Sequence, residues 1–269
     1  MSERSLSFGE NLVAGGFSGF CFIFCSYPID LLKTLYQAQS FDYRTLKREN
    51  IFGLWRGSLF PVLLGAASGM TYFTLIEGSR DLLRKRLGQS TLSAKSEFIA
   101  GAATGFVAGV IQNFVDVVKI NLQVYRGGNL NSLQFLRQTL QQHAYRMYLR
   151  PLFLSAVTKM WATGVFLSTY FHTYKQFPPH SNYTGLICGG LAGLISWNAS
   201  FLLDTLRTLM ISSRQSVSWV ELVRQVVFMD RQTLINVYLL GLLRAVVSGG
   251  CSFFAYDLAS KFIKADRAK

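Results

Sequence analysis

The stretch that decides the fold is AGGFSGFCFIFCSYPIDLLK, residues 14–33. It begins with the hexad AGGFSG, in which five residues are small, continues through an uncharged apolar segment, and ends with Asp30 and Lys33. Glycines four apart lie on one helix face and let a second helix backbone approach closely, which is how many helices pack in lipid. An acid and a base three residues apart also share a helix face. The stretch therefore predicts a membrane helix with a packing face in its first half and paired charges at its far end.

The same pattern occurs twice more, as AGAATG beginning at Ala100 and CGGLAG beginning at Cys188. In all three units an acid follows the first glycine by fifteen residues, and a base follows the acid by three. The resulting pairs are Asp30 with Lys33, Asp116 with Lys119, and Asp204 with Arg207. The acids are 86 and 88 residues apart, which predicts three structural repeats at about 10–88, 96–176 and 181–264.

Composition favours a membrane protein, since 15% of the residues are charged, against about 25% in an ordinary soluble domain. About 20 apolar residues of helix cross a bilayer core. Six stretches approach that length, and the last two in this list are each interrupted by one basic residue: 11–29, 57–76, 98–115, 181–203, 151–174 and 233–256. We expect an all-α membrane protein forming one domain over residues 1–269. It would have six transmembrane helices, in three repeats related by a pseudo-threefold axis, around a central cavity.

The chain carries 27 Lys and Arg against 14 Asp and Glu, a formal net charge of +13. These bases lie between apolar runs and form no basic patch with interleaved aromatics, so we expect no nucleic-acid partner and favour anionic lipid. The four cysteines are Cys21, Cys25, Cys188 and Cys251. They lie inside apolar runs without metal-ligand spacing and are predicted to be buried, structural residues. The sequence shows no catalytic, metal-binding or cofactor motif, so we predict neither an enzyme nor a bound metal or cofactor.

At the repeated residues the sequence resembles the mitochondrial carrier family, whose three repeats each hold two transmembrane helices and a short matrix-side helix. The first repeat is the most similar, with Pro28, Asp30 and Lys33 in the family's P-x-D-x-x-K pattern and Gln37 as its glutamine brace. The resemblance implies a multi-pass protein of the mitochondrial inner membrane. It also implies a small-molecule substrate and a monomeric carrier unit.

The resemblance implies a matrix gate made of ion pairs between successive repeats. The implied pairs are Asp30 with Lys119, Asp116 with Arg207, and Asp204 with Lys33. Gln37 and Gln123 would brace them, and Pro28 would bend its helix because proline removes a backbone hydrogen bond. Phe114 and Leu202 stand where the family has its other two prolines.

The family closes the opposite, cytoplasmic side with an acid and a base on each even-numbered helix. The implied residues are Glu77 with Arg80, and Asp257 with Lys261. The second repeat has Phe171 in place of the acid, so we expect this gate to be weak. In the family the triplet Trp55, Arg56 and Gly57 interacts with lipid headgroups, and cardiolipin is the anionic lipid we expect.

Lys159 and Arg244 interrupt apolar spans near their middles, where a charge costs at least about 2.5 kcal/mol. Such residues usually face water or a ligand, although either could instead snorkel or brace a carbonyl. The family's three substrate contact points correspond to Leu64, Thr158 and Arg244, and Lys159 adjoins the second. Two cations without a mid-membrane acid predict an anionic or zwitterionic substrate.

Two functions remain open at this stage. One is a solute carrier working by alternating access, and Trp197 with its neighbours makes the chain resemble the carnitine/acylcarnitine and basic amino-acid carriers. An S-adenosylmethionine carrier is another possibility within this function. The second is a carrier-fold protein without transport activity, serving as a structural or accessory subunit of a respiratory complex. The missing prolines and the weak cytoplasmic gate favour the subunit, whereas the six retained gate charges favour transport.

Overall fold

The structure of the protein is a computed structural model. It describes residues 7–37, 59–89, 91–124, 137, 146–177, 183–213 and 218–266. Within these ranges, the side chains of residues 59–61, 119 and 122–124 are not described.

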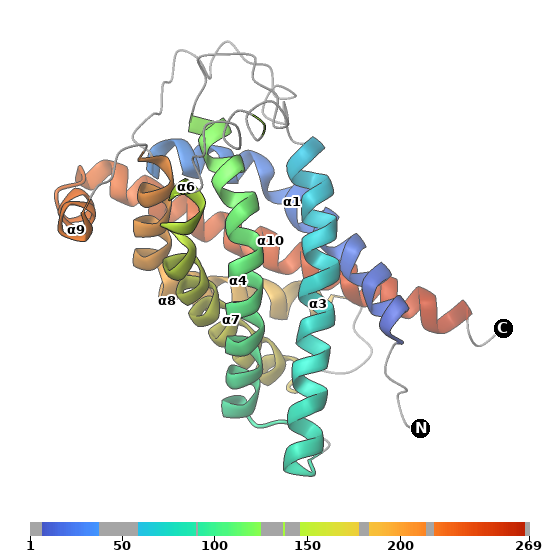
Figure 1. The fold of residues 1–269 in the computed structure, drawn as a ribbon. Coiled ribbons are helices and arrows are strands. Elements are labelled where there is room, and N and C mark those ends of the chain that lie inside the picture. Colours follow the sequence, from blue (N-terminus) through green and yellow to red (C-terminus); the bar gives the residue numbers. More distant parts are fainter. Residues whose placement is uncertain are drawn as a thin grey trace.

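Six long helices make up nearly all of the described chain, together with two short ones (Figure 1). The long helices are α1 Phe8–Gln37, α3 Leu59–Leu87, α4 Ala94–Val124, α7 Leu152–Tyr174, α8 Thr184–Ser212 and α10 Arg231–Asp266. The short ones are α6 Arg146–Leu149 and α9 Trp219–Val227, the latter capped by the Ser218 side chain, which accepts from the Glu221 amide. The predicted all-α architecture is confirmed.

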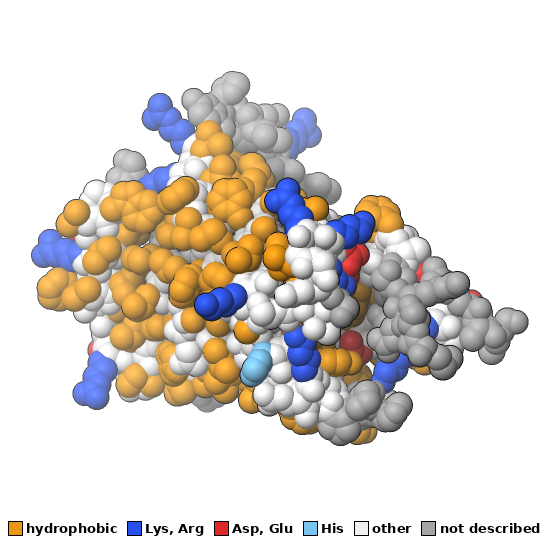
Figure 2. Space-filling view, turned by 90° about the horizontal axis from the view of Figure 1, so that it is seen from below, with side chains coloured by type: hydrophobic (Ala, Val, Ile, Leu, Met, Phe, Trp, Pro, Cys, Tyr) orange, Lys and Arg blue, Asp and Glu red, His pale blue; other side chains and the backbone are white. Residues whose placement is uncertain are grey.

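Within the described ranges, five helical segments are long and apolar enough to cross a membrane. They are Phe8–Gln37, Ala94–Val118, Arg146–Tyr174, Thr184–Ser212 and Arg231–Asp266. The remaining long helix, α3, carries no charge from Leu59 to Ile76. It ends at Leu87 and is followed by Gly88, whose φ of 62° lies in the left-handed region that glycine adopts readily. Large hydrophobic side chains are exposed along all six long helices, and on the face seen in Figure 2 they cover much of the surface, with basic side chains scattered among them. A surface of this kind suits lipid around the sides and water or headgroups at the ends.

The six long helices form a closed ring in the order α1, α3, α4, α7, α8 and α10, with α10 returning to contact α1. In Figure 1, α3 and α4 run side by side in front, and α1 and α10 cross diagonally behind them. The start of α1 lies beside the end of α10, where the Tyr256 hydroxyl donates to Asn11 at 2.6 Å. A closed ring of this kind leaves an interior that all three repeats share.

The small-residue hexads form the contacts between the two long helices of each repeat, as their spacing predicts. A Cβ atom added to Gly19 of α1 would lie 2.1 Å from the carbonyl oxygen of Gly65 on α3. The corresponding distances are 2.3 Å from Gly105 of α4 to an α7 carbonyl and 2.2 Å from Gly193 of α8 to an α10 carbonyl. No larger residue fits these positions without separating the helices.

The prediction that all four cysteines are buried is wrong for Cys25, which is exposed, and holds only in part for Cys21 and Cys251. Cys188 is buried, and all four are free thiols. Cys21 and Cys25 lie on α1 among exposed phenylalanines such as Phe24, on a helix whose outer face is apolar because it meets lipid. An apolar position in a membrane helix therefore does not imply burial in protein.

Candidate functional site

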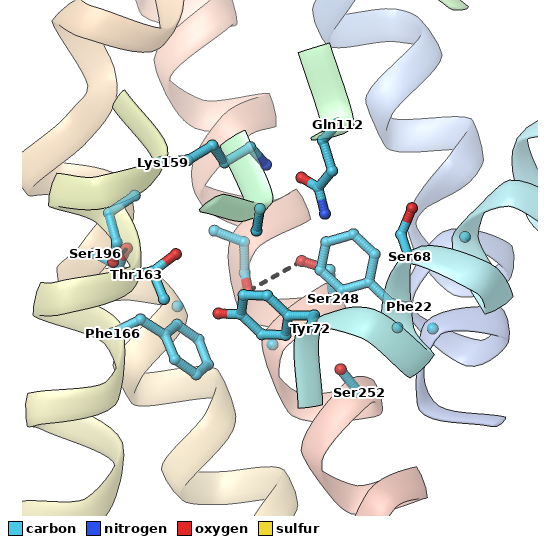
Figure 3. A pocket seen from close by; sticks show the side chains of 18 of the residues that line it. Phe22, Ser68, Tyr72, Gln112, Lys159, Thr163, Phe166, Ser196, Ser248 and Ser252 are labelled. Atoms are coloured by element: carbon cyan, nitrogen blue, oxygen red, sulfur yellow. Dashed lines mark hydrogen bonds between the residues drawn. The ribbon is translucent and has the colours of Figure 1, made fainter. Parts of the chain in front are cut away.

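A cavity of about 240 Å³ lies inside the ring of helices and is lined by residues of all six. One representative from each helix, in chain order, is Gly19, Ser68, Gln112, Lys159, Trp197 and Arg244. Figure 3 shows that polar side chains point into this space from several helices, above the rings of Tyr72 and Phe166. The volume is suited to a small metabolite rather than a large cofactor.

Lys159 of α7 and Gln112 of α4 point toward the same part of the cavity (Figure 3). Lys159 forms no ion pair within 4.0 Å and no hydrogen bond with the described residues. Its neighbour Thr158 also lines the cavity, and the Thr158 hydroxyl donates to the Leu154 carbonyl at 2.7 Å. Lys159 thus places a positive charge at the cavity wall without a direct ion-pair partner among the described residues, although Asp116 and Asp204 lie near enough to interact with it electrostatically.

Ion pairs close one end of the cavity. Lys33 of α1 lies 2.5 Å from Asp204 of α8, and Arg207 of α8 contacts Asp116 of α4. Arg207 also lies 3.8 Å from Asp204, which connects the two pairs. We call Lys33, Asp116, Asp204 and Arg207 the ion-pair network. It joins the far ends of the first helices of all three repeats.

Two other side chains support the ion-pair network. The Gln37 amide donates to the Thr205 hydroxyl at 3.3 Å, between α1 and α8, one helical turn beyond Lys33. The Arg207 guanidinium donates to the Ser155 hydroxyl at 2.9 Å, which adds α7 to the network. These bonds hold the charged groups against neighbouring helices and leave fewer alternative positions for them.

Trp197 of α8 lies between the cavity and the ion-pair network. The Lys33 ammonium lies 4.2 Å from the centre of its ring, within the range of a cation–π contact. Its indole nitrogen donates to the Tyr238 carbonyl at 3.2 Å. The ring packs against Gly241 of α10 so closely that a Cβ there would lie 1.9 Å from it. One side of the Trp197 ring is therefore held by α10, and the other side contacts the Lys33 ammonium of the ion-pair network.

Arg244 of α10 lines the cavity, but its guanidinium lies 2.5 Å from the Asp30 carboxylate of α1. The prediction that Arg244 is a cavity cation without an acid nearby is therefore wrong. The sequence could not show this, because Asp30 comes near Arg244 only through the packing of α1 against α10. The implied pair of Asp30 with Lys119 falls on a side chain outside the described set.

The opposite end of the cavity is closed by an apolar cluster. Its buried members are Phe73, Ile76, Leu167, Tyr170, Cys188, Ala192 and Phe253. Phe73 of α3 stacks on Tyr256 of α10 with ring centres 4.2 Å apart, and Tyr170 of α7 lies 4.0 Å from Phe253 by the same measure. The second helices of all three repeats thus meet through rings, and this closure is far more apolar than the charge pattern alone indicates.

The charged residues near the apolar cluster are arranged unequally. Arg80 lies 3.2 Å from Glu77 on the same helix, and it also makes two bonds of 2.9 and 3.1 Å to Glu97 at the start of α4. The Asp257 carboxylate lies against the backbone of Gly185 on α8. The first repeat therefore keeps its acid and base in an ion pair, and in the third repeat Asp257 and Lys261 interact electrostatically along α10.

Comparison with known proteins agrees with this architecture. A family model described as mitochondrial carrier protein matches residues 4–87 and 90–181, which correspond to the first two predicted repeats and make up more than half of the chain. The chain belongs to the mitochondrial carrier family. It is accordingly a multi-pass protein of the mitochondrial inner membrane and a solute carrier, and members of this family are transporters rather than enzymes.

Two relatives align with nearly the whole carrier. The mitochondrial carnitine/acylcarnitine carrier protein of Mus musculus is 23% identical over 94% of this chain and 94% of its own. The mitochondrial arginine transporter BAC2 of Arabidopsis thaliana is 26% identical over 94% of this chain and 91% of its own. The mitochondrial 2-oxodicarboxylate carrier of Mus musculus is 29% identical, but over 64% of this chain and 62% of its own. The first two of these relatives are a carnitine/acylcarnitine carrier and an arginine transporter, which agrees with the branch of the family that the sequence resembles.

The remaining predicted residues of the carrier are placed as follows. Leu64 is not among the residues that line the cavity, whereas Ser68, one helical turn further along α3, is. Pro28 lies within the continuous helix α1. The triplet of Trp55, Arg56 and Gly57 lies outside the described residues, as do the side chains of Lys119 and Gln123.

Three features of the carrier were missed by reasoning from sequence. These are Glu97 as a partner of Arg80, Trp197 as the support of Lys33, and the apolar cluster. Glu97 had a weak signal, since it is an acid directly beside an apolar span. The other two depend on residues far apart in the chain and left no local pattern to find.

Proposed function

We propose that this carrier moves a small metabolite with one carboxylate group, anionic or zwitterionic, by alternating access. The observation that carries the proposal is the Lys159 ammonium in the cavity wall, without an acid within ion-pair distance among the described residues. A buried charge of this kind is costly unless a ligand or water compensates it. A substrate carboxylate would supply the compensation during each transport cycle.

The charges around the cavity support a single carboxylate rather than several. Arg244 has Asp30 beside it, and Asp204 has Lys33. Asp116 has Arg207. These acids and bases pair with one another, which leaves Lys159 as the one charged cavity residue, among those described, that has no ion pair within 4.0 Å. A ligand with several negative charges would find one free partner and would have to break ion pairs for the others.

Hydroxyl groups in the cavity support a substrate that also donates hydrogen bonds. The Ser196 hydroxyl donates to the Ala162 carbonyl at 2.8 Å, and Ser248 donates to the Ala245 carbonyl at 3.4 Å. Their protons are used within the protein, so their oxygen lone pairs are left to accept from a ligand. An ammonium or hydroxyl group on the substrate suits such acceptors, and this favours a zwitterionic metabolite.

Alternating access follows from the two different closures of the cavity. The ion-pair network closes one end and the apolar cluster closes the other, and each joins helices from all three repeats. Lys33 and Arg207 are buried in this closure, so opening it requires water or substrate groups to compensate the separated charges. Substrate binding would favour the conformation in which one closure is released.

The proposal extends to the surroundings of the carrier. The six helices of one chain already enclose the cavity, which supports a monomeric unit. The net charge of +13 supports attraction to anionic lipid such as cardiolipin. A stable protein complex is the competing possibility, and copurification after mild detergent extraction would reveal it.

The test is exchange of radiolabelled substrates by the purified carrier in liposomes. The panel contains carnitine, acylcarnitines, arginine, 2-oxodicarboxylates, S-adenosylmethionine and neutral amino acids. We expect a substrate with one carboxylate to exchange, Lys159→Gln to reduce its exchange at least tenfold, and Lys159→Arg to retain most of it. Exchange that is indifferent to Lys159→Gln would refute the assigned contact.

The same assay addresses the non-transporting alternative. The relatives named as carriers or transporters favour transport. Folded protein that exchanges nothing on the panel, and that copurifies in fixed ratio with a respiratory complex, would instead support an accessory subunit.

A further inference from the structure

Asn113 of α4 lies behind the ion-pair network and connects three helices through its side chain. It is 0% exposed, as is Ser155 of α7. The Asn113 amide nitrogen donates to the Tyr148 carbonyl of α6 at 2.7 Å, and its amide oxygen accepts from the Ser155 hydroxyl at 2.8 Å. Both ends of this buried amide are therefore bonded within the protein.

The direction of each bond in this chain follows from the groups that make it. A carbonyl oxygen can only accept, so the Tyr148 carbonyl requires the NH₂ group of Asn113 and turns the amide oxygen toward Ser155. Ser155 gives its one hydroxyl proton to that oxygen. Its lone pairs are then left to accept from Arg207 of α8, whose Nε donates to the Ser155 hydroxyl at 2.9 Å. The serine is thus held as an acceptor for the guanidinium.

We propose that Asn113 and Ser155 are positioning residues, which together with Asp116 form a socket for the Arg207 guanidinium. Asp116 of α4 contacts the same guanidinium through another nitrogen. The socket belongs to α4 and α7, and Arg207 enters it from α8 when the ion-pair network closes the cavity. The inference rests on the proposed function, since a socket acts only if that closure opens and re-forms.

The packing of α4 on α7 keeps the socket together when α8 moves. A Cβ atom added to Gly109, one helical turn before Asn113, would lie 2.9 Å from the Ser155 carbonyl oxygen and 2.8 Å from the Cα atom of Ala156. The two backbones are therefore in contact at the socket itself. Among the described residues α7 packs more extensively on α4 than on α8, and α4 touches α8 only slightly. Arg207 thus crosses the weaker boundary and is the member that leaves.

A socket prepared in advance makes the closure easier to re-form. Arg207 is 5% exposed when paired, so its guanidinium must exchange water for protein acceptors each time the closure forms. Asp116 supplies the compensating charge, and Ser155 supplies a second acceptor. Because Asn113 already fixes the serine hydroxyl, that group does not have to be ordered when Arg207 arrives.

The test measures how readily the cavity is reached through the end that the ion-pair network closes. The four native cysteines are replaced by alanine, and Ser68→Cys provides one thiol in the cavity wall. Carriers in liposomes are treated with a membrane-impermeant maleimide from each side in turn. Lys95→Cys, at the exposed start of α4, shows in a separate sample which side holds the opposite end. We expect Ser155→Ala to raise labelling through the ion-pair end about tenfold, the lower range for losing a hydrogen bond to a charged group.

Ser212→Ala is the matched control on α8. The Ser212 hydroxyl donates to the Leu209 carbonyl of its own helix at 3.2 Å, so its removal should leave the labelling rate at the parent value. Thermal unfolding in detergent confirms that each variant is folded.

A background without the guanidinium distinguishes positioning from a purely structural role. In Arg207→Gln the socket has nothing to hold, so adding Ser155→Ala should no longer change the labelling rate. Asn113→Leu should raise the rate as Ser155→Ala does, and the double variant should not exceed the larger single effect, because both act through one chain of bonds. If Asn113→Leu does not fold, the two Ser155→Ala comparisons still decide.

An unchanged labelling rate in Ser155→Ala would overturn the proposal, as would an increase that persists in full with Arg207→Gln. These outcomes are separable from those of the exchange assay. A labelling shift in a protein that exchanges no carboxylate would retain the socket and refute the proposed transport. Carboxylate exchange that depends on Lys159, together with unchanged labelling, would do the reverse.

Discussion

Arg244 of α10 and Asp30 of α1 lie 2.5 Å apart, at the boundary between the cavity and the ion-pair network. Arg244 lines the cavity, and Asp30 lies one helical turn before Lys33 of the ion-pair network. The pair therefore connects the substrate space to the charged closure by direct contact. A substrate group that competes for either residue would alter the closure without touching the network itself.

Asp30→Asn should destabilise the carrier, because it leaves the Arg244 guanidinium largely buried without its carboxylate. Breaking one side of a buried ion pair costs about 3–5 kcal/mol, and we expect the lower value here since 20% of the Arg244 side chain is exposed. Thermal unfolding in detergent measures the loss. The double variant Asp30→Asn with Arg244→Gln should lose less than the sum of the two single changes, and simple additivity would show that the contact contributes nothing.

Lys33→Glu should reduce exchange in liposomes at least tenfold, because it places two carboxylates together in the closure with Asp204. Adding Asp204→Lys should restore part of the exchange by re-forming the pair with reversed charges. Recovery will be incomplete, since the new lysine would stand beside Arg207. Lys95→Glu, on the exposed start of α4, is the matched control and should leave exchange unchanged.

Gly19→Ala should destabilise the contact between α1 and α3, where the added Cβ would lie 2.1 Å from the Gly65 carbonyl oxygen. Backbone atoms cannot turn aside as a flexible side chain can, so the helices must separate. Gly78→Ala is the control within α3, because nothing lies within 4 Å of a Cβ there. That change should raise stability by about 0.5–1 kcal/mol through helix propensity. Equal melting temperatures for the two variants would contradict the assigned packing.

Trp197→Leu should weaken the hold on Lys33 by about 0.5–2 kcal/mol, because it removes the ring beneath the ammonium while keeping an apolar side chain. Trp197→Phe keeps an aromatic face and should lose less. The measurement is substrate exchange by the Trp197→Leu and Trp197→Phe variants. When Lys33→Gln is added to both variants, the difference between their exchange rates should vanish. A difference that persists there would indicate packing against Gly241 rather than the cation.

Much of the fold could be predicted from the sequence because the determining patterns are local and repeated. The hexads at Ala14, Ala100 and Cys188 each lie within one helix, so their glycine spacing alone identifies a packing face. The pairs of Lys33 with Asp204 and of Arg207 with Asp116 came from the resemblance, and the structure brings both into contact. The threefold pattern of the sequence relates these residues because each occupies the same position in its repeat.

The burial of the cysteines and the partner of Arg244 could not be predicted in the same way. Cys25 lies in an apolar run as a buried residue would, but lipid accepts an apolar surface on the outside of the protein. Arg244 interrupts an apolar span in a way that suggests a ligand contact, and the sequence does not show that Asp30 lies beside it. The free-energy cost of burying a charge predicts that the charge has a partner, but it does not identify the partner residue.

The sequence by itself determined the helices, their three repeats and the face by which each pair packs, since helical periodicity and glycine spacing act over a few residues. Only the tertiary structure decided which charges remain free in the cavity and which residues close its second end. Those outcomes depend on side chains from different repeats meeting within a few ångströms, as Arg80, Glu97 and Phe171 do. Phe171 stands where the repeat pattern has an acid, and its contact with Arg80 is visible only in the tertiary structure.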